Sequence, residues 1–575
     1  MGRPRSTDGL KPTLVRRGEK IYAYETTSRM ENGKKVNIKR YLGVFDPATG
    51  KILEKDENRC AERKKKASEE RAFKVIDELA IGDYGGVYLL DEIQRQIGLG
   101  KDLFRSFGSV SKLILASAMA LTLGRPRVYS IEGTLDHTWL RRYYGVESSL
   151  DSGSMTALTE QMGHAQANID TLFSFRLEGC EEIVCWDTTT HGAHSEMEGL
   201  AQYLSVNKDD EDIPQFKVGL ATDMRGIPVM YRIYPGTLGD TQTIQRLFDD
   251  LDEFGLKDVI ATFDRGFLSG RNCRDIIGRG RRFVMPGKTD YKVFKTLLTR
   301  FKTSEKKDMR FQDHIYSVSE TELGLALSEN RVSTDGSPAY DFTLPGDESH
   351  GKDGMLKAYV CFDSETYNDQ IQSHKLLVSD IMEKASKISC RDPVKAFNKL
   401  AGKAARFFDV AADGKNVIVT AKKNSESFFM NRAGMFILVT TPDVTWLQAM
   451  SAYEVRRLTE QAYNHSKEED GRFRTSNKDR LQGRMLLRFL SVIMKCEIAA
   501  RIREARMESK LDVTTCIENM STISARRYRG CGRLTEVTKR CRTICETLKI
   551  PIPVEVRENM EIYSPEDLES ILQSE

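Results

Sequence analysis

The sequence predicts an α/β protein whose central sheet is interrupted by a long, mainly β insertion and flanked by helical regions. Three observations support this fold class. Apolar strand-like runs alternate with helical patterns from residue 181 onward. Residues 87–175 upstream repeat apolar side chains at three- and four-residue intervals. Two long helical patterns lie downstream, beyond a stretch of short alternating segments.

A chain of 575 residues is too long for one hydrophobic core and suggests two to four domains. The changes in pattern predict six consecutive regions. They are a basic arm with a β-hairpin and a charged helix (1–80), a helical domain (81–178), the first part of the α/β core (179–299), a β-rich insertion domain (300–430), the second part of the core (431–510) and a helical tail (511–575).

Composition sets broad limits on function. The chain is 40% hydrophobic and 30% charged, which is ordinary for a soluble globular protein, and its net charge of +3 says nothing about nucleic acid. The first fifty residues are different, since eleven Lys or Arg against five Asp or Glu give them a net charge of +6. A basic arm on a balanced body is a modest indication of nucleic-acid binding.

Eleven irregularly spaced cysteines fit reduced thiols better than a disulfide framework. The chain opens without an apolar signal segment, and no apolar run reaches the roughly 18 residues that a membrane span needs. We therefore expect a cytoplasmic protein that does not enter a membrane.

The N-terminal arm contains two features. Gly2-Arg3-Pro4-Arg5 resembles the core of an AT-hook, in which Arg3 and Arg5 would lie in a narrow minor groove, although an unstructured basic terminus explains it equally well. Asn32-Gly33 is a strong hairpin-turn dipeptide and predicts a β-hairpin within residues 20–53. Residues 54–80 have the pattern of a charged helix.

The helical domain is expected to contain helices at Val87–Ile97, Ser111–Leu123 and Thr156–Phe175. A helix is the element that fits a DNA major groove, so DNA binding is one interpretation of this domain. A bundle that only packs on the core would have the same pattern.

The core pattern begins with three strands, a helix and a fourth strand. They are expected at Ile183–Asp187, Phe216–Thr222, Pro228–Tyr234, Thr241–Phe254 and Val259–Phe263. This is the element order of the RNase H-like fold. Because a parallel connection through a helix places strand ends side by side, we expect Asp187 and Asp264 to meet, although 77 positions separate them.

Asp264 and Glu460 are 196 positions apart, far more than one connection between core elements needs. The intervening residues 300–430 are therefore predicted to form a separate, mainly β insertion domain. The apolar run Gly434–Thr441 then returns the chain to the core.

One helical stretch carries the most chemistry. Tyr453, Arg456, Glu460 and Lys467 fall within one arc of an α-helix. A carboxylate can hold a hard divalent cation, and Arg and Lys can hold phosphate, although a solvated surface ion pair would have the same pattern. Two strand-end acids and a downstream helical Glu together indicate a carboxylate cluster that binds metal and cuts phosphodiesters.

The chain also resembles a known family. Tyr453-x2-Arg456-x3-Glu460-x6-Lys467 has the spacing of the Tyr-Arg-Glu-Lys signature of one large branch of bacterial insertion-sequence DDE transposases. Asp187 and the element Asp264-Arg265-Gly266-Phe267 are similar to the first and second catalytic aspartates of that branch. The resemblance covers about residues 180 to 510.

The resemblance implies an RNase H-like enzyme that binds the ends of an insertion sequence and catalyses cut-and-paste transposition. Its expected catalytic and metal-binding residues are Asp187, Asp264 and Glu460, which would hold two Mg²⁺ ions, with Mn²⁺ tolerated. Its expected DNA-binding residues are Tyr453, Arg456, Lys467, Arg265, Arg3 and Arg5.

The expected partners are double-stranded DNA, as terminal inverted repeats and target, and a second copy of the chain in a homodimer. The expected location is the cytoplasm of a bacterium or archaeon. Two alternatives stay open: a catalytically inactive, transposase-derived DNA-binding protein, and an RNase H-like nuclease without strand transfer.

Overall fold

The structure is a computed structural model that describes residues 12–17, 20–31, 34–48, 50, 52–54, 80–124, 131–180, 182–193, 195–197, 199–203, 213–289, 291–332, 336–467, 472–475, 477–528, 531–563 and 567. The chain forms two compact units. The first comprises Met1–Ile81 and Arg526–Arg533, and the second comprises Gly82–Ala525 and Leu534–Glu575. The second unit contains the candidate site.

The first unit contains an antiparallel sheet in the order β1 (Thr13–Arg17), β2 (Lys20–Glu31), β3 (Lys34–Phe45) and β4 (Ile52–Glu54). Glu31 of β2 pairs with Lys34 of β3, which agrees with a hairpin between these strands. The turn residues Asn32 and Gly33, most of the predicted charged helix over 54–80, and Arg3 and Arg5 lie outside the described residues.

A short strand, β5 (Ala80–Asp83), spans the boundary between the two units in the sequence. The second unit then continues with a helical region, as the apolar spacing predicts. The elements of this region are α2 (Gly85–Gln96), α3 (Leu99–Phe107), η1 (Gly108–Val110), α4 (Ser111–Leu123), α5 (Ile131–His137), α6 (Leu140–Tyr144), α7 (Ser152–His164) and α8 (Gln166–Leu177). The single helix expected over Thr156–Phe175 is in fact two helices, α7 and α8, which meet at Ala165.

Leu99–Leu123 is long and apolar enough, by length and composition alone, to cross a membrane, which our sequence reading did not expect. The stretch is three consecutive elements, α3, η1 and α4, and the chain turns at Gly108, where φ is 58°. In its most apolar window, 61% is buried inside the structure. Core helices of globular proteins have the same character.

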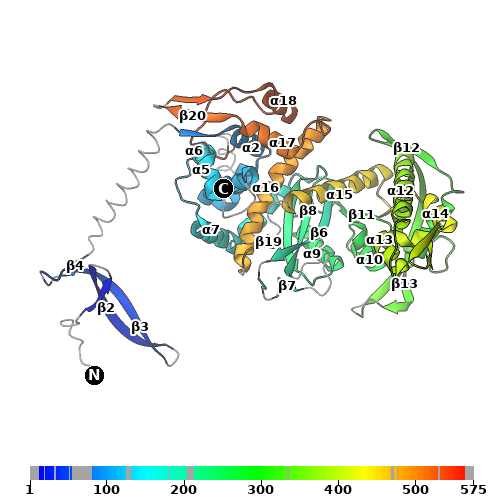
Figure 1. Ribbon diagram of the computed structural model, residues 1–575, viewed down its shortest axis with the longest axis horizontal. Helices are drawn as coiled ribbons and strands as arrows, with labels where there is room; N and C mark the ends of the chain where they lie inside the picture. Colours follow the sequence, from blue (N-terminus) through cyan, green and yellow to red (C-terminus); the bar gives the residue numbers. More distant parts are fainter. Residues whose placement is uncertain are drawn as a thin grey trace. The chain divides into compact units, whose positions relative to one another are not determined.

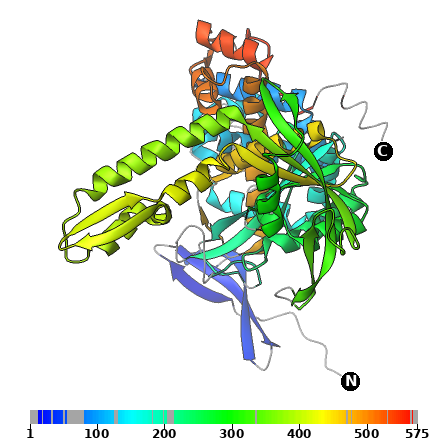
Figure 2. The same ribbon diagram turned by 90° about the vertical axis from the view of Figure 1, so that its right-hand side faces the viewer.

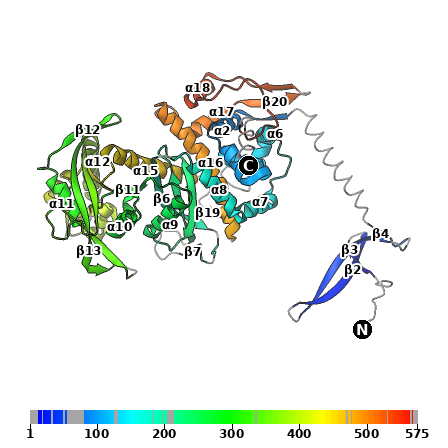
Figure 3. The same cartoon turned by 180° about the vertical axis from the view of Figure 1, so that it is seen from behind.

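The central sheet contains twelve strands within the described residues and runs in the order β12-β13-β15-β18-β11-β10-β6-β8-β7, with β14 paired to β13, β19 to β6 and β9 to β8 (Figures 1 and 3). Its first strands are β6 (Ile183–Ala193), β7 (Gln202–Tyr203), β8 (Pro214–Thr222), β9 (Pro228–Pro235), β10 (Ile260–Phe263) and β11 (Arg282–Pro286). Between β9 and β11 lie α9 (Asp240–Glu253), η3 (Arg265–Phe267) and α10 (Gly270–Gly278).

The region predicted as a separate, mainly β insertion domain, residues 300–430, contains more strand than helix, and its first strands join the central sheet. After α11 (Lys292–Arg300), its first strands β12 (Lys307–Phe311), β13 (His314–Val332), β14 (Pro338–Thr343) and β15 (Gly354–Asp363) extend the central sheet. The rest is largely helical: α12 (Ser364–Ala385), α13 (Pro393–Ala401), η4 (Gly402–Phe407), the hairpin β16 (Phe408–Asp413) and β17 (Asn416–Ala421), and α14 (Lys423–Met430).

The chain returns to the sheet at β18 (Met435–Thr440), which pairs antiparallel with both β11 and β15. It continues into α15 (Trp446–Lys467), β19 (Arg472–Phe473) and α16 (Lys478–Glu504). The predicted helical tail contains strands as well as helices: α17 (Val513–Ser521), β20 (Ser524–Tyr528), β21 (Cys531–Leu534) and α18 (Lys539–Leu548).

The helix α16 joins the helical region to the core. It crosses α7 where two glycines allow the backbones to touch, since a Cβ at Gly163 would lie 1.8 Å from the carbonyl oxygen of Asp479 and one at Gly483 would lie 1.9 Å from that of Thr159. The regions predicted at 81–178 and 431–510 therefore pack as one body.

A buried carboxylate, Asp91 of α2, organises the helical region. It is fully buried and accepts hydrogen bonds from the hydroxyls of Tyr143 at 2.7 Å and Tyr144 at 2.6 Å. Arg95 donates to it at 2.8 Å, and Arg557 from the C-terminal segment lies 3.9 Å away. The network connects α2, α6 and the C-terminal segment.

Candidate active site

The two predicted aspartates lie side by side, Asp187 on β6 and Asp264 directly after β10, the parallel neighbour of β6. The strands β6 and β10 pair in register from Ile183 and Ile260 to Trp186 and Phe263. Asp187 and Asp264 each follow that last pair by one residue. Because paired strands are about 4.8 Å apart, the two backbones are adjacent at this point.

The strand β6 does not end at Asp187 as expected. It continues to Ala193, and Asp187 pairs on its other side with Leu220 of β8. The β-branched residues Thr188–Thr190 favour this longer strand. It is the neighbouring strand β10 that ends here, at Phe263, so β6 continues past Asp187 without β10 beside it.

Both aspartates face the helix α15. Trp186 points to the opposite face of the sheet, where its indole nitrogen donates to Thr243 of α9 at 3.1 Å. Because side chains alternate along a strand, Asp187 points to the α15 face. The carboxylate of Asp264 contacts α15 directly, through Arg456.

Two contacts fix α15 against the sheet, and both were missed by our sequence reading. The hydroxyl of Tyr463 donates to the backbone oxygen of Asp187 at 2.6 Å. The hydroxyls of Thr459 and Thr222 lie 2.6 Å apart in a buried contact. Thr459 and Tyr463 lie four positions apart, so they share one side of the helix. This spacing could have indicated from the sequence that α15 has a second side, which faces the sheet.

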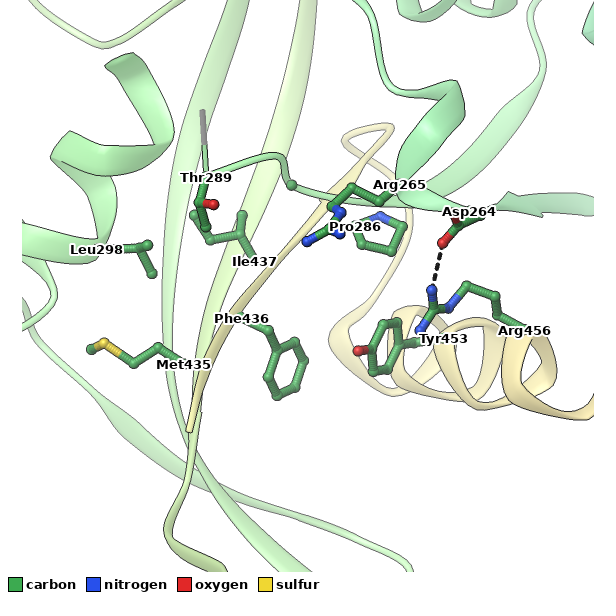
Figure 4. A pocket seen from close by; sticks show the side chains of 11 residues that line it. Asp264, Arg265, Pro286, Thr289, Leu298, Met435, Phe436, Ile437, Tyr453 and Arg456 are labelled. Atoms are coloured by element: carbon green, nitrogen blue, oxygen red, sulfur yellow. Dashed lines mark hydrogen bonds and ion pairs between the residues drawn. The ribbon is translucent and has the colours of Figure 1, made fainter. Parts of the chain in front are cut away.

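Arg456 lies between two of the three predicted acids. Its Nη1 is 2.5 Å from Oδ1 of Asp264 and 3.7 Å from Oε1 of Glu460 (Figure 4 shows the first contact). Its guanidinium carbon lies 5.1 Å from the centre of the Tyr453 ring, a cation–π distance. The Tyr453 ring in turn stacks on Phe436 at 5.2 Å, with 9° between the ring planes.

The pKa of Asp264 is lower than usual. Burial raises this pKa, but hydrogen bonds from the backbone at Arg265 and Gly266 and the contact with Arg456 together outweigh burial. Burial lowers the pKa of Arg456, but nearby Tyr453, Asp264 and Glu460 raise it overall. Both groups are therefore charged at neutral pH.

Replacing Arg456 with Gln is expected to remove stability that depends on pH. The low folded-state pKa of Asp264 means that its pair with Arg456 stabilises the fold above the unfolded-chain pKa of 3.8. This contribution is lost as pH falls through the folded-state pKa. Because the pair is partly exposed, the loss in the variant should stay below about 1 kcal/mol at pH 6 and shrink by pH 3.5. Urea unfolding at both pH values measures it, and an equal loss at both contradicts the assignment.

A cavity of about 240 Å³ opens beside Asp264. Charged side chains of Asp264, Arg265 and Arg456 line part of it, and apolar side chains such as Leu298 and Met435 line the rest (Figure 4). Arg265 is exposed on η3, the turn directly after Asp264. The cavity thus joins an acid and two guanidinium groups to an apolar recess.

Two lysines lie close to the site in the sequence, Lys467 at the end of α15 and Lys288 after β11. Lys467 is the last residue of α15, and its side chain lies outside the part of the chain that is described. Lys288, which was not predicted, donates to the backbone oxygens of Gly266 at 3.0 Å and Leu268 at 2.7 Å. It therefore holds the loop that follows Asp264.

The three predicted metal ligands have suitable chemistry, but they are not grouped as a metal site. Carboxylate oxygens are the ligands that Mg²⁺ prefers, and Asp187, Asp264 and Glu460 provide them. In the described part of the chain, however, no three His, Cys, Asp or Glu side chains are grouped closely enough to hold a metal ion. Since Arg456 contacts both Asp264 and Glu460, it would have to release them before all three acids could share an ion.

Comparisons with known proteins bear on the same region. Residues 178–333 match the family model of the transposase DDE domain. The matched region runs from β6 through β13, and it includes Asp187, Asp264 and Arg265. It excludes α15, so the match does not reach Glu460.

No curated protein matches the chain. Among solved structures, it is similar to the cryo-EM structure of the piggyBac transposase synaptic complex with hairpin DNA, at 11% identity and a TM-score of 0.21, over 75% of this chain and 76% of the other. The matched region supports a general connection to DNA transposition and to enzymes that transfer nucleotidyl groups.

Proposed function

We propose that this protein is a DNA transposase that binds insertion-sequence ends and cuts and joins DNA strands by cut-and-paste transposition. One observation carries the proposal. Within a region similar to the transposase DDE domain, Asp187, on one of two adjacent parallel strands, and Asp264, directly after the other, lie beneath the helix that presents Arg456 and Glu460. We also assign the chain to the Tyr-Arg-Glu-Lys branch of bacterial insertion sequences, on the spacing of its α15 residues.

The strand order supports an RNase H-like core. It runs β9-β8-β6-β10-β11, in which β9, β8 and β6 are antiparallel neighbours and β6, β10 and β11 are parallel neighbours. This order follows from the predicted sequence of three strands, a helix and a fourth strand. It brings the first and fourth strands together, which is what a pair of strand-borne acids requires.

Each residue has a chemical role in this proposal. Asp187, Asp264 and Glu460 would hold two Mg²⁺ ions, or Mn²⁺, which lower the pKa of an attacking water or 3′-hydroxyl and stabilise the leaving oxygen. Arg456, Lys467 and Arg265 would bind the DNA backbone phosphates near the reacting bond.

Arg456 would exchange its carboxylate contacts for phosphate contacts when DNA is bound. Tyr453 would donate a hydrogen bond to a phosphate and, through its stacking on Phe436, hold the Arg456 guanidinium in place. The basic terminus with Arg3 and Arg5, and the helices of residues 81–178, would add DNA contacts away from the reacting bond.

We also propose that the protein acts as a homodimer in a reducing cytoplasm. A homodimer would hold two DNA ends together for joining. The described cysteines are all free, and most are buried, which suits a reducing cytoplasm of a bacterium or archaeon.

Nicking of supercoiled DNA tests the function. The wild-type protein should nick the plasmid when Mg²⁺ or Mn²⁺ is added and not when EDTA is present. Asp187→Asn and Asp264→Asn should each lower this rate at least about 100-fold, since each removes a charge from the reacting centre. Asp223→Asn is the control, because Asp223 is a turn residue whose carboxylate accepts from Ile227 and Arg225.

Metal-independent or undetectable nicking by the wild-type protein would contradict the enzyme. It would favour the alternative of an inactive, transposase-derived DNA-binding protein. Nicking without any joining of a 3′-end to target DNA would favour a nuclease instead.

A further inference from the structure

The chain leaves the central sheet after β15 and returns at β18, and the residues between them build an arm, defined here as residues 364–430. Figure 2 shows α12 and the β16–β17 hairpin extending beyond the strands to which they connect. The arm has its own small core, in which Ile381 of α12, Phe397 of α13 and Phe408 of β16 are buried together. It is therefore a folded projection with a defined surface.

The arm carries a local excess of positive charge. The whole arm has eleven Lys or Arg and eight Asp or Glu, a net charge of +3, and the charge is concentrated in residues 384–423, where ten Lys or Arg stand against three Asp or Glu, a net charge of +7. Four of the ten cations contact a carboxylate or the Phe407 ring within the arm. The other six are exposed and have no ion-pair partner among the described residues: Arg391, Lys395, Lys399, Lys403, Lys415 and Lys423.

Three of these lysines, Lys395, Lys399 and Lys403, recur at every fourth position along α13 and η4 and are called the lysine row here. The buried residues of α13 also recur at every fourth position, at Pro393, Phe397 and Ala401. Lys395 and Lys399 are displaced from them by two positions, about 200° around a helix, so they point away from the core of the arm. Lys403 is exposed in η4, which follows α13 after a change of backbone direction at Gly402, where φ is 52°. The first two lysines are about 6 Å apart along the helix axis.

The ammonium groups of neighbouring lysines repel one another, and a line of negative charges placed beside them would offset this repulsion. Duplex DNA presents one phosphate charge per about 1.7 Å of its axis, so it offers a line of negative charge of this kind. Lys binds phosphate as a point charge on a flexible stem and does not discriminate between bases. The chemistry of the row therefore fits a DNA backbone and carries no sequence preference.

We infer that the lysine row of the arm binds the phosphate backbone of duplex DNA, at a place that does not line the cavity beside Asp264. This rests on the proposed function only in taking DNA as the substrate. The arm would add affinity and orientation, and the residues around Asp264 would act on the strand.

A second copy of the chain is the competing partner for this surface. Several apolar side chains are exposed on the arm: Leu376, Leu377 and Met382 on α12, Leu400 on α13 and Ile418 on β17. They are spread over three elements and stand among charged residues, whereas the three lysines follow one another closely in α13 and η4. Charge therefore favours DNA, and self-association is an outcome that the experiment must detect.

The test is the salt dependence of binding to a 30-base-pair duplex of random sequence, measured by fluorescence anisotropy with the full chain. The triple variant Lys395→Gln, Lys399→Gln, Lys403→Gln should bind more weakly. The slope of log affinity against log salt concentration should fall in magnitude by about 2 to 3, because each phosphate contact contributes about 0.9. The triple Lys→Arg variant at the same positions keeps the charge and should keep the wild-type slope.

The matched control neutralises three exposed lysines outside the arm that also have no ion-pair partner among the described residues: Lys257, Lys510 and Lys539. Its slope should change by less than about 1. Equal slopes for the arm variant and the wild-type protein would overturn the inference while leaving the nicking test of the proposed function untouched. Loss of self-association in sedimentation, with an unchanged slope, would assign the lysine row to a second copy and also overturn it.

Discussion

Replacing Glu460 with Gln is expected to abolish metal-dependent DNA cleavage, with a rate loss of at least about 100-fold. The amide has nearly the shape of the carboxylate but no negative charge to offer a divalent cation. Glu460 is 54% exposed, and within the described residues it pairs with Arg456 at 3.7 Å, so we expect the loss of its charge to have little effect on the fold. Binding of DNA ends should stay largely intact, because Arg456 and the basic surfaces are unchanged.

Glu454→Gln is the matched control for this variant. Glu454 lies on the same helix, six positions earlier and so about 240° around it, and pairs with Arg457. This control should cleave DNA at nearly the wild-type rate. Both variants are compared in the plasmid nicking assay, with end binding measured in parallel by gel shift. Cleavage retained by Glu460→Gln would remove Glu460 from the mechanism and leave Asp187 and Asp264 to be explained without it.

Replacing Asp91 with Ala is expected to destabilise the helical region by about 3 to 5 kcal/mol. The variant leaves the hydroxyls of Tyr143 and Tyr144 without their acceptor in a buried setting, and it leaves Arg95 without its buried carboxylate. Each of these groups then stays buried without a hydrogen-bond partner, and its desolvation free energy is no longer offset. Arg557 would also lose a neighbour, so the C-terminal segment should open together with α2 and α6.

Urea unfolding followed by circular dichroism measures the loss, and Asp136→Ala is the control. Asp136 is 57% exposed and pairs with Arg141 on the surface, so its removal should cost less than about 1 kcal/mol. A loss of similar size in both variants would show that the Asp91 network does not hold the helical region together.

The acids of the candidate site could be found from the sequence because each belongs to a local pattern. An apolar strand followed by Asp predicts Asp264, and helical spacing places Arg456 and Glu460 on one face. The parallel pairing of β6 and β10 follows from the intervening helix. These rules use only neighbouring residues, and they are enough to predict that β6 pairs with β10 and which side of α15 carries Arg456 and Glu460.

Other features could not be found in this way. That Arg456 would lie between Asp264 and Glu460 depends on where α15 crosses the sheet, and this is fixed by buried contacts of Thr459 and Tyr463. That strands of the insertion would join the central sheet was not predicted, because β13, β15 and β18 pair over long sequence distances. Alternation along a strand reveals that it has two faces, but it does not reveal which sheet it joins.

The way the arm is attached has a consequence for how such a chain can vary. Phe362 of β15 pairs with Met435 of β18, and the amide of Asp363 donates to the carbonyl oxygen of Gly434 at 2.9 Å. The exit and re-entry points are therefore adjacent, and β18 is fixed independently by β11. We therefore expect that the arm can be lengthened, shortened or replaced by a tight turn while α15 keeps its position over Asp187 and Asp264.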